Sequence, residues 1–352
     1  MRAQLSIALG LSAALAVVVV PRPLLACGGF YAAEIEVASD QNIIVTHRGG
    51  VETYVFRPHF CGAAKDFGVI LPIPATLSGT PALADNALFD ELDRFTEPET
   101  VEECEARGLG CGASAGDGDL GTRGAQDHGV NVVDRGRVGI FEYVLLQATT
   151  TSAFTDWLTQ NGFPYDAGMS AVYESYVTRQ WYFVAFKVSA DTTAPPAGKK
   201  LCGDLGPLQV SFATPSPVIP ARIAAVNSAN VAAPVWRLFV VTAAQQAVTN
   251  TSFSSSLNFS RPLRNADLGG FPALAAVAQD GERLTVLDVT FPWNGASDDI
   301  NLQVDPNQRD FRSVRHVTRE CGGLGCAGSN LATSASGVAL VLAAIGRMRR
   351  RR

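Results

Sequence analysis

The sequence contains few histidines. There are four in 352 residues, and none stands in an H-E-x-x-H spacing or beside a C-x-x-C pair, the patterns that mark common zinc sites. They are His47, His59, His128 and His316. The sequence therefore predicts no catalytic residue, no metal site and no cofactor.

Charged residues are also sparse. Asp, Glu, Lys and Arg make up 17% of the chain, whereas there are 33 glycines and 19 prolines. This composition is typical of a secreted, loop-rich, β-rich protein. The formal net charge is −5. Removing the two terminal segments described below takes away Arg2, Arg22 and five arginines near the end, which leaves 21 basic against 33 acidic residues, near −12. Such a charge argues against binding to nucleic acid or to an anionic membrane surface.

A long apolar run is lacking, but both ends of the chain carry a short one. Met1-Arg2 precedes an apolar stretch from Leu5 to Val20, and Leu24-Leu25-Ala26 precedes Cys27. Residues 1–26 are therefore predicted to be a secretory signal peptide, removed from the mature protein. Leu24 to Cys27 loosely matches a lipobox, although Pro21-Arg22-Pro23 interrupts the apolar run. Whether Cys27 is lipidated or bridged stays open.

The C-terminal end, residues 321–352, has three parts. A Cys321-Gly-Gly-Leu-Gly-Cys326 motif precedes an apolar segment of roughly 15 residues, which is shorter than the roughly 20 that span a bilayer. Arginines between 347 and 352 would hold the end on the cytoplasmic side. This order resembles the MYXO-CTERM sorting tails that myxosortases process, with Gly325-Cys326 at the recognised position. The resemblance implies cleavage at Cys326, and a plain C-terminal anchor is the alternative.

The most informative internal stretch runs from Phe141 to Ser189. Its pattern predicts strand, helix, turn, helix and strand, with Thr150, Thr151 or Ser152 capping the first helix and Asn161-Gly162 ending it. Apolar residues recur at helical spacing in both helices. They are Phe154, Trp157 and Leu158, then Met169, Val172, Tyr173 and Tyr176. We expect Trp157, Trp181, Phe183 and Phe186 to be buried, with Trp181 to Val188 as a central strand.

The rest of the chain predicts further strands and one helix. Two runs around Arg48-Gly49-Gly50 predict a hairpin, and Pro72 and Pro74 should end a strand or place it at an edge. The segment Val248 to Leu263 is Ser-rich and is predicted to be loop with marginal strand. The predicted strands are 43–47, 51–57, 67–73, 141–147, 181–188, 208–212, 236–242 and 284–291, and a further helix is predicted from Asp85 to Phe95. The fold class is α+β: β-rich, mostly antiparallel, with a few packed helices in one exported domain, 27–320.

Two acidic or glycine-rich stretches invite functional interpretations. Residues 107–129 contain Gly112-Ala-Ser-Ala-Gly116, a G-x-S-x-G pattern, but no buried strand precedes it and no helix follows it, as a nucleophile elbow requires. Asp117, Asp119 and Asp127 could bind calcium, yet the EF-hand spacing is absent. A second acidic group comprises Asp298, Asp299, Asp305 and Asp310. Solvated loops and a solvated edge are the favoured interpretations.

The chain has seven cysteines: Cys27, Cys61, Cys104, Cys111, Cys202, Cys321 and Cys326. Export to an oxidising compartment predicts disulfides, and an odd number requires an exception. Cys104 and Cys111 close a short loop and form the candidate pair. A disulfide is also favoured for Cys61 over a thiol–imidazole pair with His59, but its partner stays open. Cys27 and Cys326 are the candidate processing residues.

Several short motifs follow one another in the order seen in a bacterial family. They are Ala26-Cys-Gly-Gly-Phe30, Phe67-Gly-Val-Ile-Leu-Pro-Ile-Pro74, Leu88-Phe-Asp-Glu-Leu92, Trp157-Leu-Thr-Gln-Asn-Gly162 and Trp181-Tyr-Phe-Val-Ala-Phe-Lys187. From Cys27 to about Glu320 the chain thus resembles the "domain of unknown function 2330" proteins. The family has no assigned activity, so the resemblance transfers no functional residue.

Together these patterns predict an exported protein at the envelope or outer surface of a Gram-negative, myxobacterial cell, anchored to the membrane at least transiently. The expected partners are the secretion machinery, signal peptidase, a myxosortase-like protease and the membrane, but no nucleic acid. A non-enzymatic structural or binding role is the first hypothesis. An envelope hydrolase and a calcium-stabilised adhesive module are the alternatives.

Overall fold

The computed structural model describes residues 29–31, 41–62, 68–105, 130–163, 167–189, 201–223, 235–290 and 298–320. The chain divides into two compact units, which are described separately: Met1–Glu97 with Gly116–Arg312, and Pro98–Ala115 with Ser313–Arg352. The predicted signal peptide, the predicted loops 107–129 and 191–200 and the predicted C-terminal tail lie outside the described residues.

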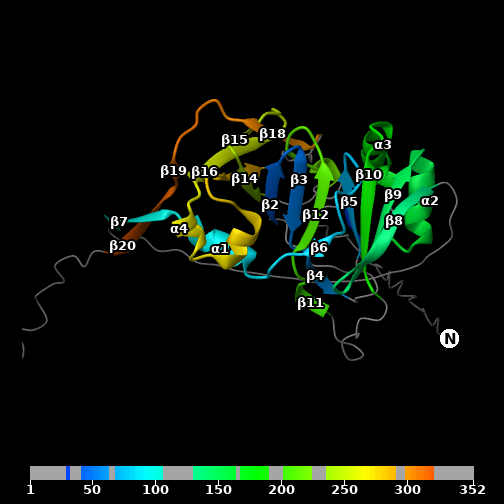
Figure 1. The fold of residues 1–352 in the computed structure, drawn as a ribbon, viewed down its shortest axis with the longest axis horizontal. Coiled ribbons are helices and arrows are strands. Elements are labelled where there is room, and N and C mark those ends of the chain that lie inside the picture. The colour runs from blue at the N-terminus through cyan, green and yellow to red at the C-terminus, as the bar shows by residue number, and fades with distance from the viewer. Residues whose placement is uncertain are drawn as a thin grey trace, which may run out of the picture. The chain divides into compact units, whose positions relative to one another are not determined.

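The first unit contains a five-stranded antiparallel sheet with helices on one face (Figure 1). Its strand order is β1-β5-β10-β9-β8. The strands are β1 (Gly29–Tyr31), β5 (Gly68–Ile73), β8 (Val130–Val138), β9 (Phe141–Ala148) and β10 (Tyr182–Val188). The covering helices are α2 (Thr151–Gln160) and α3 (Ser170–Thr178), the latter preceded by a 3-10 turn, Ala167–Met169.

A second, eight-stranded sheet has the order β19-β16-β17-β14-β2-β3-β12-β6. Its strands are β2 (Gln41–Arg48), β3 (Val51–Phe56), β6 (Ala82–Leu83), β12 (Leu208–Ala213), β14 (Val235–Thr242), β16 (Ser254–Pro262), β17 (Arg283–Thr290) and β19 (Phe311–Arg312). All its pairings are antiparallel except β14 with β2. The helices α1 (Leu88–Phe95), α4 (Asn265–Leu268) and α5 (Pro272–Val277) pack on its outer face.

Two smaller sheets complete the first unit. One has the order β13-β18-β15, formed by Val218–Ile219, Ile300–Val304 and Gln246–Val248. The other pairs β4 (His59–Gly62) with β11 (Leu201–Asp204). The β-rich, mostly antiparallel α+β fold predicted from the sequence is confirmed.

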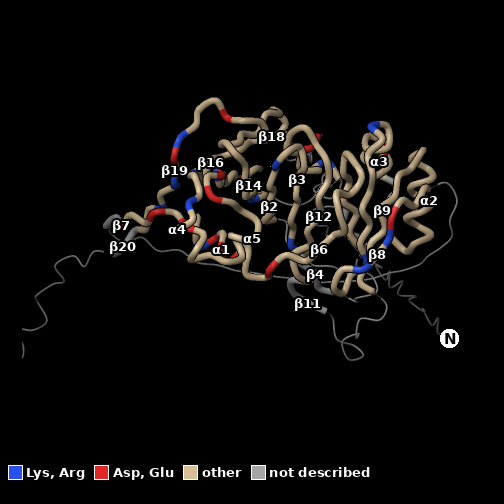
Figure 2. Tube along the Cα trace, viewed as in Figure 1, with Lys and Arg blue, Asp and Glu red and all other residues tan. Residues whose placement is uncertain are grey.

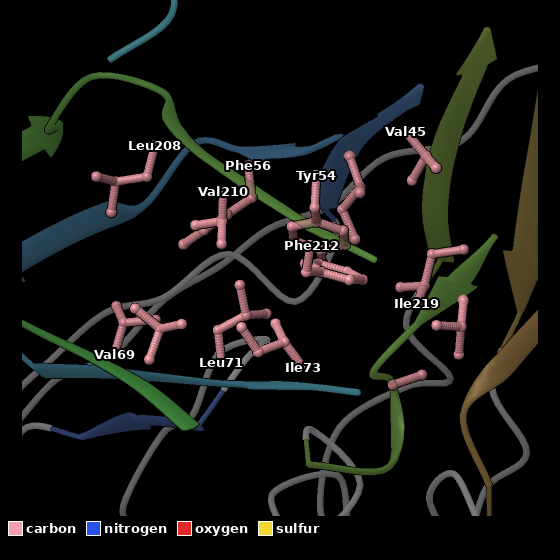
Figure 3. Packing of buried hydrophobic residues seen from close by; sticks show 14 of the residues in the cluster. Val45, Tyr54, Phe56, Val69, Leu71, Ile73, Leu208, Val210, Phe212 and Ile219 are labelled. Carbon is pink, nitrogen blue, oxygen red and sulfur yellow. The ribbon is translucent and has the colours of Figure 1, made fainter. Parts of the chain in front are cut away.

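The two large sheets share one apolar interior, here called the central core (Figure 3). Figure 3 shows side chains of β3 and β12 pointing toward side chains of β5. Those labelled are Tyr54, Phe56, Leu208, Val210 and Phe212 on one side and Val69, Leu71 and Ile73 on the other. The helices cover the opposite faces, so the central strands of both sheets are buried on both sides.

The segment Phe141 to Ser189 folds as its pattern predicts. The Thr150 hydroxyl accepts a hydrogen bond from the Ala153 amide at 3.2 Å and so caps α2. Asn161 ends the helix, and Gly162 has a positive φ of 68°, which glycine adopts without strain. All seven predicted stripe residues of α2 and α3 are buried.

The predicted hairpin is also confirmed. Gly49 and Gly50 have φ angles of 58° and 79° and form the two-residue turn between β2 and β3. The prediction for Pro72 was wrong, because Pro72 lies inside β5 and β5 lies between β1 and β10, whereas Pro74 follows the end of the strand as predicted. In β5, Pro72 pairs with Phe183 of β10 on one side. Strand β1 pairs only with Gly68 to Ile70, so Pro72 lies beyond its reach. A residue without an N–H is tolerated there.

Two further predictions were wrong. Val248–Leu263 is not mainly loop, because it contains the nine-residue β16. The serines at the start of this strand are exposed, and Phe259 and Ser260 are buried against β17. Because so much of the strand is exposed, its sequence lacks the alternating apolar residues by which a strand is usually predicted. Trp181 is only partly buried, because it precedes β10 and lies between the two apolar clusters at their margin. Trp157, Phe183 and Phe186 are buried as expected.

The described part of the second unit is a two-stranded parallel ribbon. Strand β7 (Glu99–Glu105) pairs with β20 (Val314–Glu320). Cys104 lies opposite Arg319 in this register. Its candidate partner Cys111 lies outside the described residues, so the Cys104–Cys111 pair stays a prediction.

Removing the ring of Phe183 should destabilise the first unit strongly. This ring stacks on Phe154 with centroids 4.0 Å apart and is fully buried. We expect Phe183→Ala to lower the free energy of unfolding by about 3–5 kcal/mol, measured by urea denaturation. Val133→Ala, at a side chain that is 43% exposed, is the control and should stay within about 0.5 kcal/mol. Similar losses for both variants would contradict this packing.

Candidate functional site

The most distinctive polar cluster of the described residues surrounds Asp299, just before β18. This carboxyl is 1% exposed. It accepts hydrogen bonds from the Tyr176 hydroxyl at 2.5 Å and from the Arg179 guanidinium at 2.8 Å. The backbone amide of Arg222 donates to it at 3.2 Å. The cluster therefore joins α3 to two segments that follow it in sequence by roughly 45 and 120 residues.

Arg179 is held by more than its ion pair. Its guanidinium lies 4.3 Å from the ring centroid of Trp181 and 4.8 Å from that of Tyr176. Its Nε donates to the Ser175 carbonyl at 2.9 Å. Cation–π contacts of this kind add to the ion pair when the group is partly desolvated. The exposed Arg179 side chain thus lies between the Asp299 cluster and solvent. Trp181 packs against this arginine at the edge of the cluster, so it is only partly buried.

Burial dominates the electrostatics of this cluster. It raises the pKa of Asp299, and the hydrogen bond from Tyr176 and the charge of Arg179 offset only part of that effect. Burial and the nearby Asp299 charge raise the pKa of Tyr176 well above its usual value, so the hydroxyl stays protonated and donates. A buried carboxyl needs hydrogen-bond partners. The Asp299 carboxyl has three donors from the chain itself, Tyr176, Arg179 and Arg222, and this group of four residues is here called the Asp299 brace.

A second buried carboxyl belongs to Glu52 of β3, which is fully buried. Its Oε2 accepts from the Val218 amide at 2.9 Å, whereas among the described residues no group forms a hydrogen bond with Oε1. Desolvation raises the pKa of Glu52 well above its ordinary value, and the Val218 hydrogen bond opposes this shift. Burial thus favours the protonated form of Glu52, and the hydrogen bond with Val218 fastens β13 to the eight-stranded sheet.

Other buried polar groups serve the same purpose. Glu91 of α1 accepts from the Leu274 amide of α5 at 2.9 Å. Gln245 accepts from the Ser260 hydroxyl at 2.9 Å and donates to Asp305 at 2.8 Å. These contacts join a helix to a helix and a loop to a strand. Sequence reasoning missed all of them, because each partner is distant in sequence.

The predicted acidic group does not gather into one site. Asp299 is buried in the cluster above, so its assignment to a solvated edge was wrong. Asp305 binds Gln245, and Asp310 pairs with Arg283 at 2.9 Å. Within the described ranges, no group of three or more His, Cys, Asp or Glu side chains is arranged to hold a metal ion.

The remaining candidate residues are placed as follows. His47 contacts the Thr214 carbonyl at 2.9 Å, and Cys61 lies in β4. Cys27, Cys326, the G-x-S-x-G motif and Asp117, Asp119 and Asp127 lie outside the described residues. No helix in the part of the chain that the structure describes is long and apolar enough to cross a membrane. Figure 2 shows basic and acidic positions interspersed along the described trace of the first unit.

Comparison with known proteins places this α+β chain in a family of bacterial proteins. Residues 21–303 match the family model "DUF2330: Uncharacterized protein conserved in bacteria". The chain belongs to the DUF2330 family. No curated protein matches it.

Among solved structures, the chain is similar to the crystal structure of baculovirus P35. The identity is 8%, and the match covers 80% of this chain and 98% of that one with a TM-score of 0.34. A likeness this distant carries no argument about fold or function.

The titration of Glu52 should make stability depend on pH. In the unfolded chain this carboxyl ionises at its ordinary pKa, whereas burial keeps it protonated in the folded chain to higher pH. Its contribution to stability is therefore present in acid and is lost as the pH rises. We expect the stability difference between Glu52→Gln and the natural chain to shift in favour of the variant as the pH rises from about 4 to about 8.

Urea denaturation across that pH range measures this shift. Glu174→Gln is the matched control, because Glu174 is exposed on α3. A pH-independent difference for Glu52→Gln, parallel to that of the control, would show that Glu52 is charged in the folded protein.

The Asp299 brace can be tested by a double-mutant cycle. Tyr176→Phe removes one donor and should lower the free energy of unfolding by about 1–3 kcal/mol, because Asp299 stays buried with one hydrogen bond fewer. Combining Tyr176→Phe with Asp299→Asn should reveal a coupling energy of about 0.5–3 kcal/mol. Tyr182→Phe, outside the cluster, provides the control. Strict additivity of the two changes would mean that the contact contributes nothing.

Proposed function

We propose that this protein is exported and displayed at the cell envelope, where it acts as a structural or binding module and not as an enzyme. The signal-like N-terminus, the tripartite C-terminal tail and the membership of a family without a named activity support this proposal. On this proposal the tail holds the chain at the membrane until a myxosortase-like protease cuts near Cys326.

The proposed structural role rests on the hydrogen bonds that the buried carboxyl groups form within the chain. Asp299, Glu52 and Glu91 each accept hydrogen bonds from the chain's own backbone or side chains. An active-site carboxylate must instead be open to a substrate or to the proton it transfers. These three buried carboxyl groups, all in the described part of the chain, are thus engaged in contacts that hold its elements together.

The envelope hydrolase is the competing function, and it would need a reactive group outside this brace. Incubation of the purified protein with peptidoglycan sacculi separates the two proposals. A structural or binding module should co-sediment with envelope material or leave it alone, and it should release no soluble fragments above buffer. Release of fragments that Asp299→Asn leaves unchanged would favour a hydrolase with a site elsewhere.

Processing gives the sharpest prediction about location. Intact-mass analysis of the protein from its native cells should show a C-terminus close to Cys326, without the arginines at 347–352. Cys326→Ala should leave an uncut precursor in the inner membrane, because the proposed protease recognises that cysteine. Cys321→Ala is the matched control and should be processed normally. A natural chain that still ends at Arg352 would mean that the tail is a simple anchor.

A further inference from the structure

Strands β4 and β11 bring two cysteines directly opposite each other. The two strands pair antiparallel, with Cys61 in register with Cys202 and Phe60 with Gly203. About 140 residues separate the two cysteines in the sequence. The sequence alone left the partner of Cys61 open, and the register now supplies one.

This register is set by the large sheet. Strands β3 and β12 are neighbours there, and Phe56 lies opposite Leu208 at the end of their pairing. The same two chain segments then continue into β4 and β11, with the Leu205 amide donating to the Pro58 carbonyl at 3.1 Å between the two ladders. The cysteines therefore oppose each other because the buried sheet aligns the segments that carry them.

Directly opposed positions suit a disulfide. In an antiparallel pair the Cα atoms of opposed residues are about 4.5 or 5.5 Å apart, depending on the hydrogen-bonding position. Disulfides require a Cα separation of about 4.4–6.8 Å. Both kinds of position fall inside that range, so the backbone requires no movement.

We propose that Cys61 and Cys202 form a disulfide that fastens the β4–β11 ribbon. A ribbon of two short strands has little stability of its own in water, so a covalent link would keep it paired where it extends beyond the sheet. In the cell, the formation of this disulfide rests on the proposed export, since disulfides persist in oxidising compartments.

The bond forms by exchange with a protein or small-molecule disulfide donor. One cysteine thiolate attacks a sulfur of the donor, which creates a mixed disulfide and releases a donor thiolate. The second cysteine thiolate then attacks the chain's own sulfur in the mixed disulfide and releases the second donor thiolate. The two cysteines lose two electrons and two protons, and the donor disulfide is reduced to two thiols.

Peptide mapping without reduction tests the pairing. Trypsin leaves each cysteine alone in its peptide, residues 49–65 for Cys61 and 201–222 for Cys202, because Pro58 protects the Arg57 bond. The full chain is reduced, desalted and oxidised with oxidised glutathione at a concentration where it is monomeric. We expect the linked pair 49–65 with 201–222, also in a Cys104→Ser control. Both cysteines found free, or linked to other cysteines, would overturn the proposal.

Two further measurements complete the test. Amide hydrogen exchange in β4 and β11 should be at least about tenfold faster in Cys61→Ser/Cys202→Ser than in the oxidised natural chain, with β3 and β12 unchanged, and equal rates would show that the link does not fasten the ribbon. The chain from native cells, alkylated at lysis, should contain the same linked peptides. Pairing in the test tube with free thiols in the cell would support the pair and would overturn export.

Discussion

The packing of the two large sheets against each other is the constraint on which the other features depend. Because helices cover the outer faces, each central strand is buried on both sides. In β10, Val184 and Phe186 enter the central core while Phe183 and Ala185 meet α2 and α3. In β14, Leu238 and Val240 enter the central core while Phe239 and Val241 face α1, α4 and α5. Such strands form continuous apolar runs instead of alternating patterns.

The burial of the central strands on both faces explains why the carboxyl groups between the layers form hydrogen bonds with the chain itself. A carboxyl placed between layers cannot reach water, and leaving it without partners would be costly. Asp299 is satisfied by three donors from its own chain, whereas Glu52 accepts from Val218 through Oε2 and burial raises its pKa, which favours the uncharged form. The Asp299–Arg179 ion pair is buried on the Asp299 side alone, because the Arg179 side chain is 37% exposed. Together with the hydrogen bonds from Tyr176 and Arg222, it links α3 to the segment before β18 and to the segment after β13.

Local pattern was sufficient to predict several of the elements, and it failed where distant contacts decide. The stripe of α2, its Thr150 cap and the Gly49-Gly50 turn are determined by neighbours in sequence and were predicted correctly. The parallel pairing of β14 with β2, which lie about 195 residues apart, has no local signal. The same holds for the Asp299 cluster and for the opposition of Cys61 and Cys202. Strand β16 was missed because its exposed serines resemble loop composition.

The edges of the two large sheets discourage pairing with other chains. An unpaired edge strand invites pairing with other chains, and natural proteins discourage this with short strands, bulges and charges. In the strands that the structure describes, the eight-stranded sheet ends in two strands of two residues each, β6 and β19. Strand β8 ends the other sheet, and it has a bulge at Val133 followed by Asp134, Arg135 and Arg137. Edges of this kind oppose the formation of intermolecular sheets, which is what the proposed display of many copies at the envelope would require.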